Sequence, residues 1–70
     1  MSLYDIQQKQ KQLIEAEIHR LLGLLREVEQ RRDVTTDPLE RAKYDSDIAA
    51  LKSSIEKNKD DLRSLENEIE

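Results

Sequence analysis

The Asp37-Pro38 pair near the middle of the 70-residue chain limits its fold more than any other feature. Proline disfavours helical geometry in the residue before it, yet it suits the first position of a helix, where no N–H donor is needed. Asp37 can cap such a helix, and Glu40 stands three residues later, where the carboxylate of a capping box reaches back to the cap. This stretch therefore predicts that one helix ends near residue 33 and a second begins at Pro38.

On both sides of this stop, apolar residues recur at alternating steps of four and three. This heptad spacing keeps them on one side of a helix and is typical of a coiled coil. We call these residues the seam: Ile14, Ile18, Leu21, Leu25 and Val28 before the stop, and Tyr44, Ile48, Leu51, Ile55, Leu62, Leu65 and Ile69 after it. A chain with 40% charged and 3% aromatic residues can be disordered, but disorder does not produce two such series.

A short connection between two long helices favours an antiparallel hairpin. The sequence thus predicts one all-α domain, a two-helix coiled-coil hairpin, with helices over about residues 4–33 and 38–69 and a turn at 34–37. The alternative is one long helix kinked at Pro38. In the hairpin, facing seam residues have numbers that add to 72 or 73, which pairs Leu21 with Leu51 and Ile14 with Asn58.

This register has two consequences for packing. The open end is expected to be weaker than the turn end, because Lys11 and Gln7 face leucines there. The register also allows ion pairs between Arg31 and Glu40 and between Glu15 and Lys59, which as exposed pairs contribute about 0–1 kcal/mol each.

The first helix has more apolar residues than one seam needs. Ile6, Leu13 and Leu24 lie beside the seam on one flank, and Leu22 lies on the other. A lone hairpin leaves these side chains exposed, and exposed apolar stripes usually mark an interface. We expect hairpins to self-associate through this stripe into a dimer or trimer, forming a helical bundle. Docking on the remainder of a larger parent protein is the alternative.

Few residues are suited to chemistry. There is no Cys, and His19 is the only His, so neither a metal site nor a nucleophile–base set is indicated. We expect no enzyme activity, no cofactor and no metal. The formal net charge of −4 argues against binding to nucleic acid or to an anionic membrane, and a cytoplasmic location is expected.

Two further residues allow more than one interpretation. Asn58 interrupts the second seam series, where a polar residue can fix register or oligomer state, or can lie near solvent. Gly23 lies inside the first helix, where glycine costs about 1 kcal/mol relative to alanine. Close approach of a partner helix would explain it, and so would a tolerated surface position.

The stretch "TDPLERAKYDSDIAALKSSIEKNKDDL" and the opening "LYDIQQKQ" resemble short helical hairpins of multidomain bacterial signalling and effector proteins. Those proteins carry NTPases of the STAND or NACHT type, TIR domains, caspase-like peptidases or TPR arrays. The matching positions are Thr36, Asp37, Pro38, Arg41, Tyr44, Ile48 and Leu51. The resemblance implies an adaptor or oligomerisation module that brings effector domains together and has no catalytic activity of its own.

We therefore expect a non-catalytic protein–protein interaction module. Two other classes remain open at this point. One is a small stand-alone regulatory protein that binds a partner through the apolar stripe of the first helix. The other is an acidic nucleic-acid mimic or accessory protein, for which binding that falls steeply with salt would be the mark.

Overall fold

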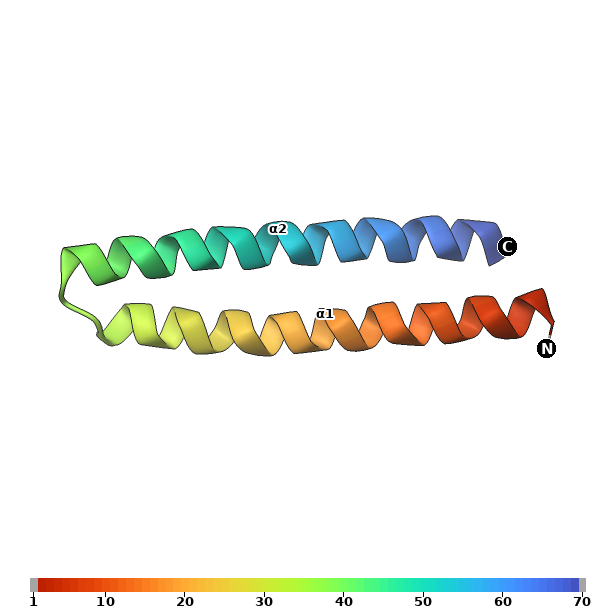
Figure 1. Cartoon of the computed structure of the whole chain (residues 1–70), viewed down its shortest axis with the longest axis horizontal. Coiled ribbons are helices and arrows are strands. Elements are labelled where there is room, and N and C mark those ends of the chain that lie inside the picture. The colour runs from red at the N-terminus through yellow and green to blue at the C-terminus, as the bar shows by residue number, and fades with distance from the viewer. Residues whose placement is uncertain (1, 70) are drawn as a thin grey trace.

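The computed structural model describes residues 2–69, apart from the side chain of Ile69, so the seam position predicted there lies outside the described side chains. Two α-helices, α1 (Leu3–Val34) and α2 (Pro38–Ile69), lie side by side and run in opposite directions (Figure 1). Each has 32 residues, so at 1.5 Å per residue each spans about 48 Å of the molecule's 53 Å length. The predicted all-α hairpin is confirmed, and the kinked single helix is wrong.

Asp37 begins α2 as the predicted cap. Its Oδ1 accepts a hydrogen bond from the backbone N–H of Leu39 at 3.0 Å, and its carbonyl accepts one from Arg41 at 2.9 Å. Pro38 is the first residue of the helix. Glu40 lies in the first turn, where the helix dipole favours a carboxylate, but its side chain forms no hydrogen bond with a described residue. The capping box is therefore only half formed.

The start of α1 has a cap that the heptad pattern did not indicate. Ser2 Oγ accepts a hydrogen bond from the backbone N–H of Asp5, and Ser2 O accepts one from Ile6, both at 3.2 Å. The helix consequently begins at Leu3, one residue earlier than expected. Serine followed three residues later by an acidic residue was the sequence signal for this cap.

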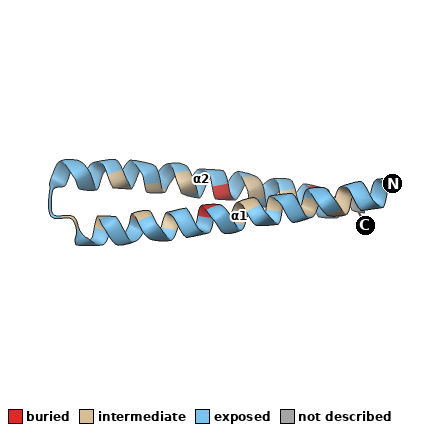
Figure 2. Cartoon of the chain, turned by 60° about the horizontal axis from the view of Figure 1, so that its bottom comes forward, coloured by how far each residue is buried: buried red, intermediate tan, exposed pale blue. Residues whose placement is uncertain are grey.

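The buried residues lie where the two helices meet (Figure 2). Among the described residues, Leu21, Ile55 and Leu65 are buried, with 4–7% of their surface exposed. The other described seam residues are half-buried: Ile14, Ile18, Leu25, Val28, Tyr44, Ile48, Leu51 and Leu62. A two-helix hairpin thus has one line of contact and little interior.

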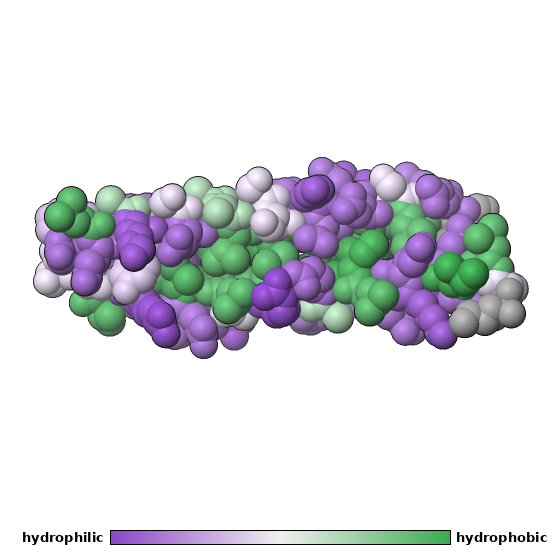
Figure 3. Space-filling view, viewed as in Figure 1, coloured by the Kyte–Doolittle hydropathy of each residue, from purple (hydrophilic) through white to green (hydrophobic). Residues whose placement is uncertain are grey.

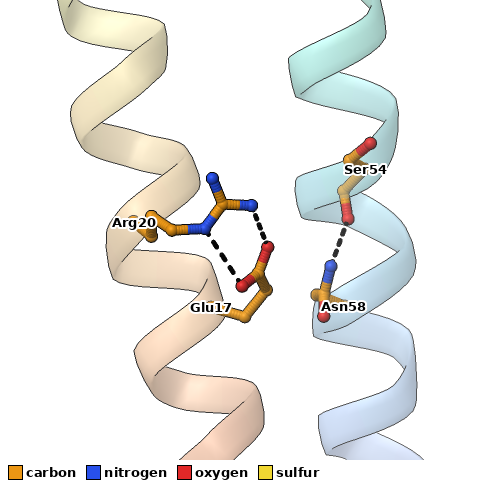
Figure 4. Close-up of polar contacts among 4 residues, drawn as sticks. All are labelled: Glu17, Arg20, Ser54 and Asn58. Carbon is orange, nitrogen blue, oxygen red and sulfur yellow. Dashed lines mark hydrogen bonds and ion pairs between the residues drawn. The ribbon is translucent and has the colours of Figure 1, made fainter.

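The register of the helices differs from the predicted one by about one helical turn. In two ion pairs that join the helices, Lys11–Glu66 and Arg32–Asp45, the residue numbers add to 77, not to 72 or 73. Figure 4 likewise shows Glu17 of α1 level with Asn58 of α2. At this offset, facing seam residues of α1 and α2 have numbers that add to about 76, so Leu21 faces Ile55.

The connection explains the shift. Thr35 is extended, with φ −87° and ψ 131°, so residues 35–37 carry the chain past the end of α1 before α2 begins. As a result α2 extends beyond α1 at the turn, and α1 extends beyond α2 at the open end (Figure 1). The predicted sums of 72 or 73 instead imply a fold point at about residue 36, with the two helices placed symmetrically about it.

The packing along the seam also differs from the expectation. Leu65 is fully buried near the open end, whereas Val28 and Tyr44 near the turn are only half-buried. Gln7 and Lys11 are half-buried at the open end as well. Long polar side chains bury their aliphatic stems while their heads stay in water, so these residues pack in place of apolar ones.

Candidate protein-interaction surface

Ion pairs between the helices lie along one flank of the hairpin, where a hollow is lined by Glu29, Arg32, Asp33, Asp45, Ile48 and Lys52. Lys11 Nζ lies 3.8 Å from Glu66 Oε1, and the Arg32 guanidinium contacts the Asp45 carboxylate. The hydrogen bond to Asp45 raises the pKa of Arg32 above its ordinary value. We call this flank the ion-pair face. The predicted pairs of Arg31 with Glu40 and of Glu15 with Lys59 do not form among the described residues.

The other flank, which we call the groove face, has three shallow hollows in a row between the helices. The hollow nearest the turn is lined by Leu24, Val28, Asp47, Ala50, Leu51 and Ser54. The hollow nearest the open end is lined by Gln10, Leu13, Ile14, Asp61, Ser64, Leu65 and Glu68. The middle hollow shares Ser54 and Asp61 with its neighbours. The three therefore form one continuous surface along the hairpin.

Small side chains of α2 keep the groove face open. Ala50, Ser54 and Ser64 line its hollows, whereas α1 contributes leucines there. Seen in space-filling form, apolar patches alternate with polar ones along the molecule (Figure 3). Leu13 and Leu24 mark the two apolar ends of the groove face, so this is the surface best suited to contact another protein.

A polar centre separates these two ends. Arg20 Nε donates a hydrogen bond to Glu17 Oε2 at 3.1 Å, and Arg20 Nη2 contacts Glu17 Oε1, so the two side chains form a two-pronged ion pair (Figure 4). Hydrogen bonding to Arg20 lowers the pKa of the Glu17 carboxyl below its ordinary value. Both residues line the middle hollow together with Lys57 and Asn58.

The predicted interface residues are exposed but do not form one stripe. Leu13 has 70% of its surface exposed, Ile6 43%, Leu22 42% and Leu24 37%. Glu17 and Arg20 interrupt the line between Leu13 and Leu24. Leu22 is two residues from Leu24, about 200° around the helix, and so lies on the opposite flank. Glu17 and Arg20 are not among the predicted interface residues, although their spacing from both leucines follows the heptad.

Asn58 takes a position other than the predicted one. It lies level with Glu17 rather than opposite Ile14, and its Nδ2 donates a hydrogen bond at 2.9 Å to the carbonyl of Ser54, one turn earlier in α2 (Figure 4). The amide donor is thus used within its own helix. Asn58 contributes a polar group to the centre of the groove face.

Gly23 lies on an exposed part of α1, and a Cβ built there would meet no atom within 4 Å. We expect Gly23→Ala to stabilise the hairpin by about 1 kcal/mol, because alanine loses less backbone entropy in a helix. Thermal unfolding followed by circular dichroism measures this change. A decrease in stability or in association would show that another helix approaches Gly23 closely.

Neither helix of the described chain is long and apolar enough to cross a membrane. Residues 2–69 also contain no cluster of three His, Cys, Asp or Glu side chains placed to hold a metal ion. His19 is exposed on α1. Fold and surface together define a two-helix antiparallel hairpin with exposed leucines, Leu13 and Leu24, along its groove face. Comparison with protein-family models, curated proteins and solved structures finds no match to this chain.

Proposed function

We propose that this hairpin is a non-catalytic protein–protein interaction module that associates through the groove face, primarily through α1. The observation that carries the proposal is the exposure of Leu13 and Leu24, 70% and 37%, on one face of a chain in whose described part only Leu21, Ile55 and Leu65 are buried. Covering these leucines removes apolar surface from water at about 25 cal/mol per Å². Association thus supplies apolar contacts that a two-helix fold lacks by itself.

Size supports the same proposal. Chains of about 70 residues rarely gain more than about 3–5 kcal/mol from one core, and many rely on a partner for further stability. This chain has neither cysteines nor a metal cluster in its described part. Homo-oligomerisation into a dimer or trimer of hairpins would complete a helical bundle. Its packing would bury the exposed leucines of α1 as well as the seam.

The resemblance to hairpins of bacterial signalling proteins adds a biological setting to this proposal. In that setting the module is an adaptor segment of a larger cytoplasmic protein and holds attached effector domains close together. It performs no reaction itself. Joining two modules raises the local concentration of whatever is linked to each of them, without any new contact between the linked domains.

The substitution Leu24→Glu tests the proposal. A charge at the apolar end of the groove face is expected to abolish association while leaving the helices intact, because Leu24 lies outside the seam. Light scattering measures the mass, and circular dichroism measures the helix content. Leu39→Glu is the matched control, since Leu39 is 83% exposed at the start of α2 and away from the groove hollows.

We expect the Leu39→Glu chain to keep the oligomeric mass of the unmodified chain and the Leu24→Glu chain to have the mass of a monomer. An unchanged oligomer in Leu24→Glu would overturn the assignment of the groove face. Loss of helix content in that variant would show instead that Leu24 supports the fold, and Leu13→Glu would then provide the test, because Leu13 is 70% exposed.

A further inference from the structure

Beside the seam, α1 carries a second heptad series that crosses the groove face. Its members follow the same alternating steps of four and three: Ile6, Gln10, Leu13, Glu17, Arg20, Leu24, Glu27 and Arg31. Glu17 is half-buried and the others are exposed. A heptad series on the surface of a helix is suited to packing against a second helix.

The four central members of this second series, Leu13, Glu17, Arg20 and Leu24, are complementary to themselves when the other helix runs antiparallel. Members placed symmetrically about the midpoint between Glu17 and Arg20 have numbers that add to 37. Leu13 of one helix then faces Leu24 of the other, and Glu17 faces Arg20. Each contact occurs twice about a two-fold axis, as in other symmetric dimers.

We propose that the partner at the groove face is a second copy of this chain, with α1 packed antiparallel on α1 about a two-fold axis between Glu17 and Arg20. The proposal rests on the proposed interaction function and specifies its partner and geometry. Two Leu13–Leu24 contacts flank a central group of two glutamates and two arginines. Each carboxylate there lies between the arginine of its own helix and that of the other copy.

Neighbouring registers are less favourable. A shift of one heptad in one direction sets Arg20 against Leu24 and Glu17 against Glu27, which loses an apolar contact and creates a repulsion. A shift in the other direction sets Ile6 against Leu24 but buries Leu13 against Glu17. Like charges that face each other cost free energy, and a carboxylate packed on leucine loses hydration without gaining a partner. The pairing centred between Glu17 and Arg20 is therefore the one that charge selects.

The charges of α2 limit the contact to α1. Asp47 and Glu68 line the two end hollows on the α2 side of the groove face. The proposed two-fold axis is level with residue 57 or 58 of α2, so Asp47 and Glu68 lie about equally far from this axis, one on either side. A dimer that stacked whole groove faces would set Asp47 of one copy against Glu68 of the other. Packing through α1 avoids this repulsion.

Two charge reversals, mixed in one tube, test the geometry. Glu17→Arg gives a chain with two positive charges at the axis, and Arg20→Glu gives a chain with two negative charges. We expect each variant alone to dimerise at least about 10-fold more weakly than the unmodified chain, because like charges meet at the axis. In an equimolar mixture we expect dimers to form again, each made of one Glu17→Arg chain and one Arg20→Glu chain. Sedimentation velocity measures the mass, and native mass spectrometry identifies the mixed species.

Two exposed sites away from the groove hollows provide matched controls. Glu56→Arg and Arg26→Glu make the same charge changes there, and each is expected to dimerise alone as the unmodified chain does. Both test variants lose the Glu17–Arg20 pair within α1. This loss is the same in each variant alone and in the mixture, so it cannot explain dimers that form only on mixing.

The outcomes separate the two proposals. If the unmodified chain dimerises and Leu24→Glu does not, but the mixture stays monomeric, the antiparallel arrangement falls and the interaction function stands. Dimerisation of Glu17→Arg alone at the strength of the unmodified chain would also overturn the arrangement. A monomeric unmodified chain at every concentration would remove both proposals.

Discussion

The substitution Ile55→Ala is expected to leave most of the chain unfolded at room temperature when the protein is dilute. Ile55 is the most buried of the described residues, with 4% of its surface exposed. Truncating a buried isoleucine to alanine typically costs about 2–5 kcal/mol, and a chain of this size gains only about 3–5 kcal/mol from its core. One cavity in the seam therefore removes most of the margin of stability.

Urea unfolding followed by circular dichroism measures this loss. Leu39→Ala is the control and is expected to change the free energy of unfolding by less than about 0.5 kcal/mol, because Leu39 is 83% exposed. A double-mutant cycle of the milder substitutions Leu21→Val and Ile55→Val tests the register, because the folded state survives these smaller truncations and residues in contact show coupling energies of about 0.5–3 kcal/mol. Coupling of Leu21 to Leu51 that exceeds its coupling to Ile55 would restore the symmetric register and contradict the structure.

The double substitution Asp37→Ala with Pro38→Ala is expected to change the topology of the molecule. It removes the carboxylate that accepts the hydrogen bond from Leu39, and it removes the ring that prevents the helix from continuing. One helix can then run from α1 into α2. The seam of each half is covered by the seam of another chain, which gives a domain-swapped dimer.

Spin labels at His19→Cys and Glu56→Cys distinguish the two topologies. Both sites are exposed and outside the groove hollows, and the chain has no cysteine of its own. In the hairpin the labels lie about 25 Å apart, whereas in a continuous helix 37 residues separate them by about 55 Å. Dilution with unlabelled chain restricts the signal to distances within one molecule. Thr36→Ala is the control, because it changes the turn but keeps Asp37 and Pro38. A short distance in the double variant would show that the cap and the proline do not decide the topology.

Much of the fold followed from local signals in the sequence. The cap at Asp37 and the proline after it set the start of α2, and the heptad spacing set which side of each helix is buried. The register did not follow, because it depends on how far the three connecting residues carry the chain. The extended backbone at Thr35 moves α2 by about one turn, and no residue type in the turn requires that geometry.

The candidate surface was predictable only in part. Leu13 and Leu24 were recognisable as apolar residues outside the seam. The charged residues between them, Glu17 and Arg20, do not belong to an apolar pattern and were not predicted. Glu17 and Arg20 belong to the same series, and the structure brings them together at the centre of the groove face. Their importance depends on the register, because the groove forms only where small residues of α2 lie level with the leucines of α1.

If the groove face of α1 is an interface between copies, the unmodified chain associates by itself. Sedimentation equilibrium over a range of concentrations measures this association. We predict that the apparent mass rises with concentration from that of one 8.2 kDa chain to about twice that value, as a symmetric dimer requires. A mass of 8.2 kDa at every concentration would rule out this interface, and Leu13 and Leu24 would then be exposed without a partner copy.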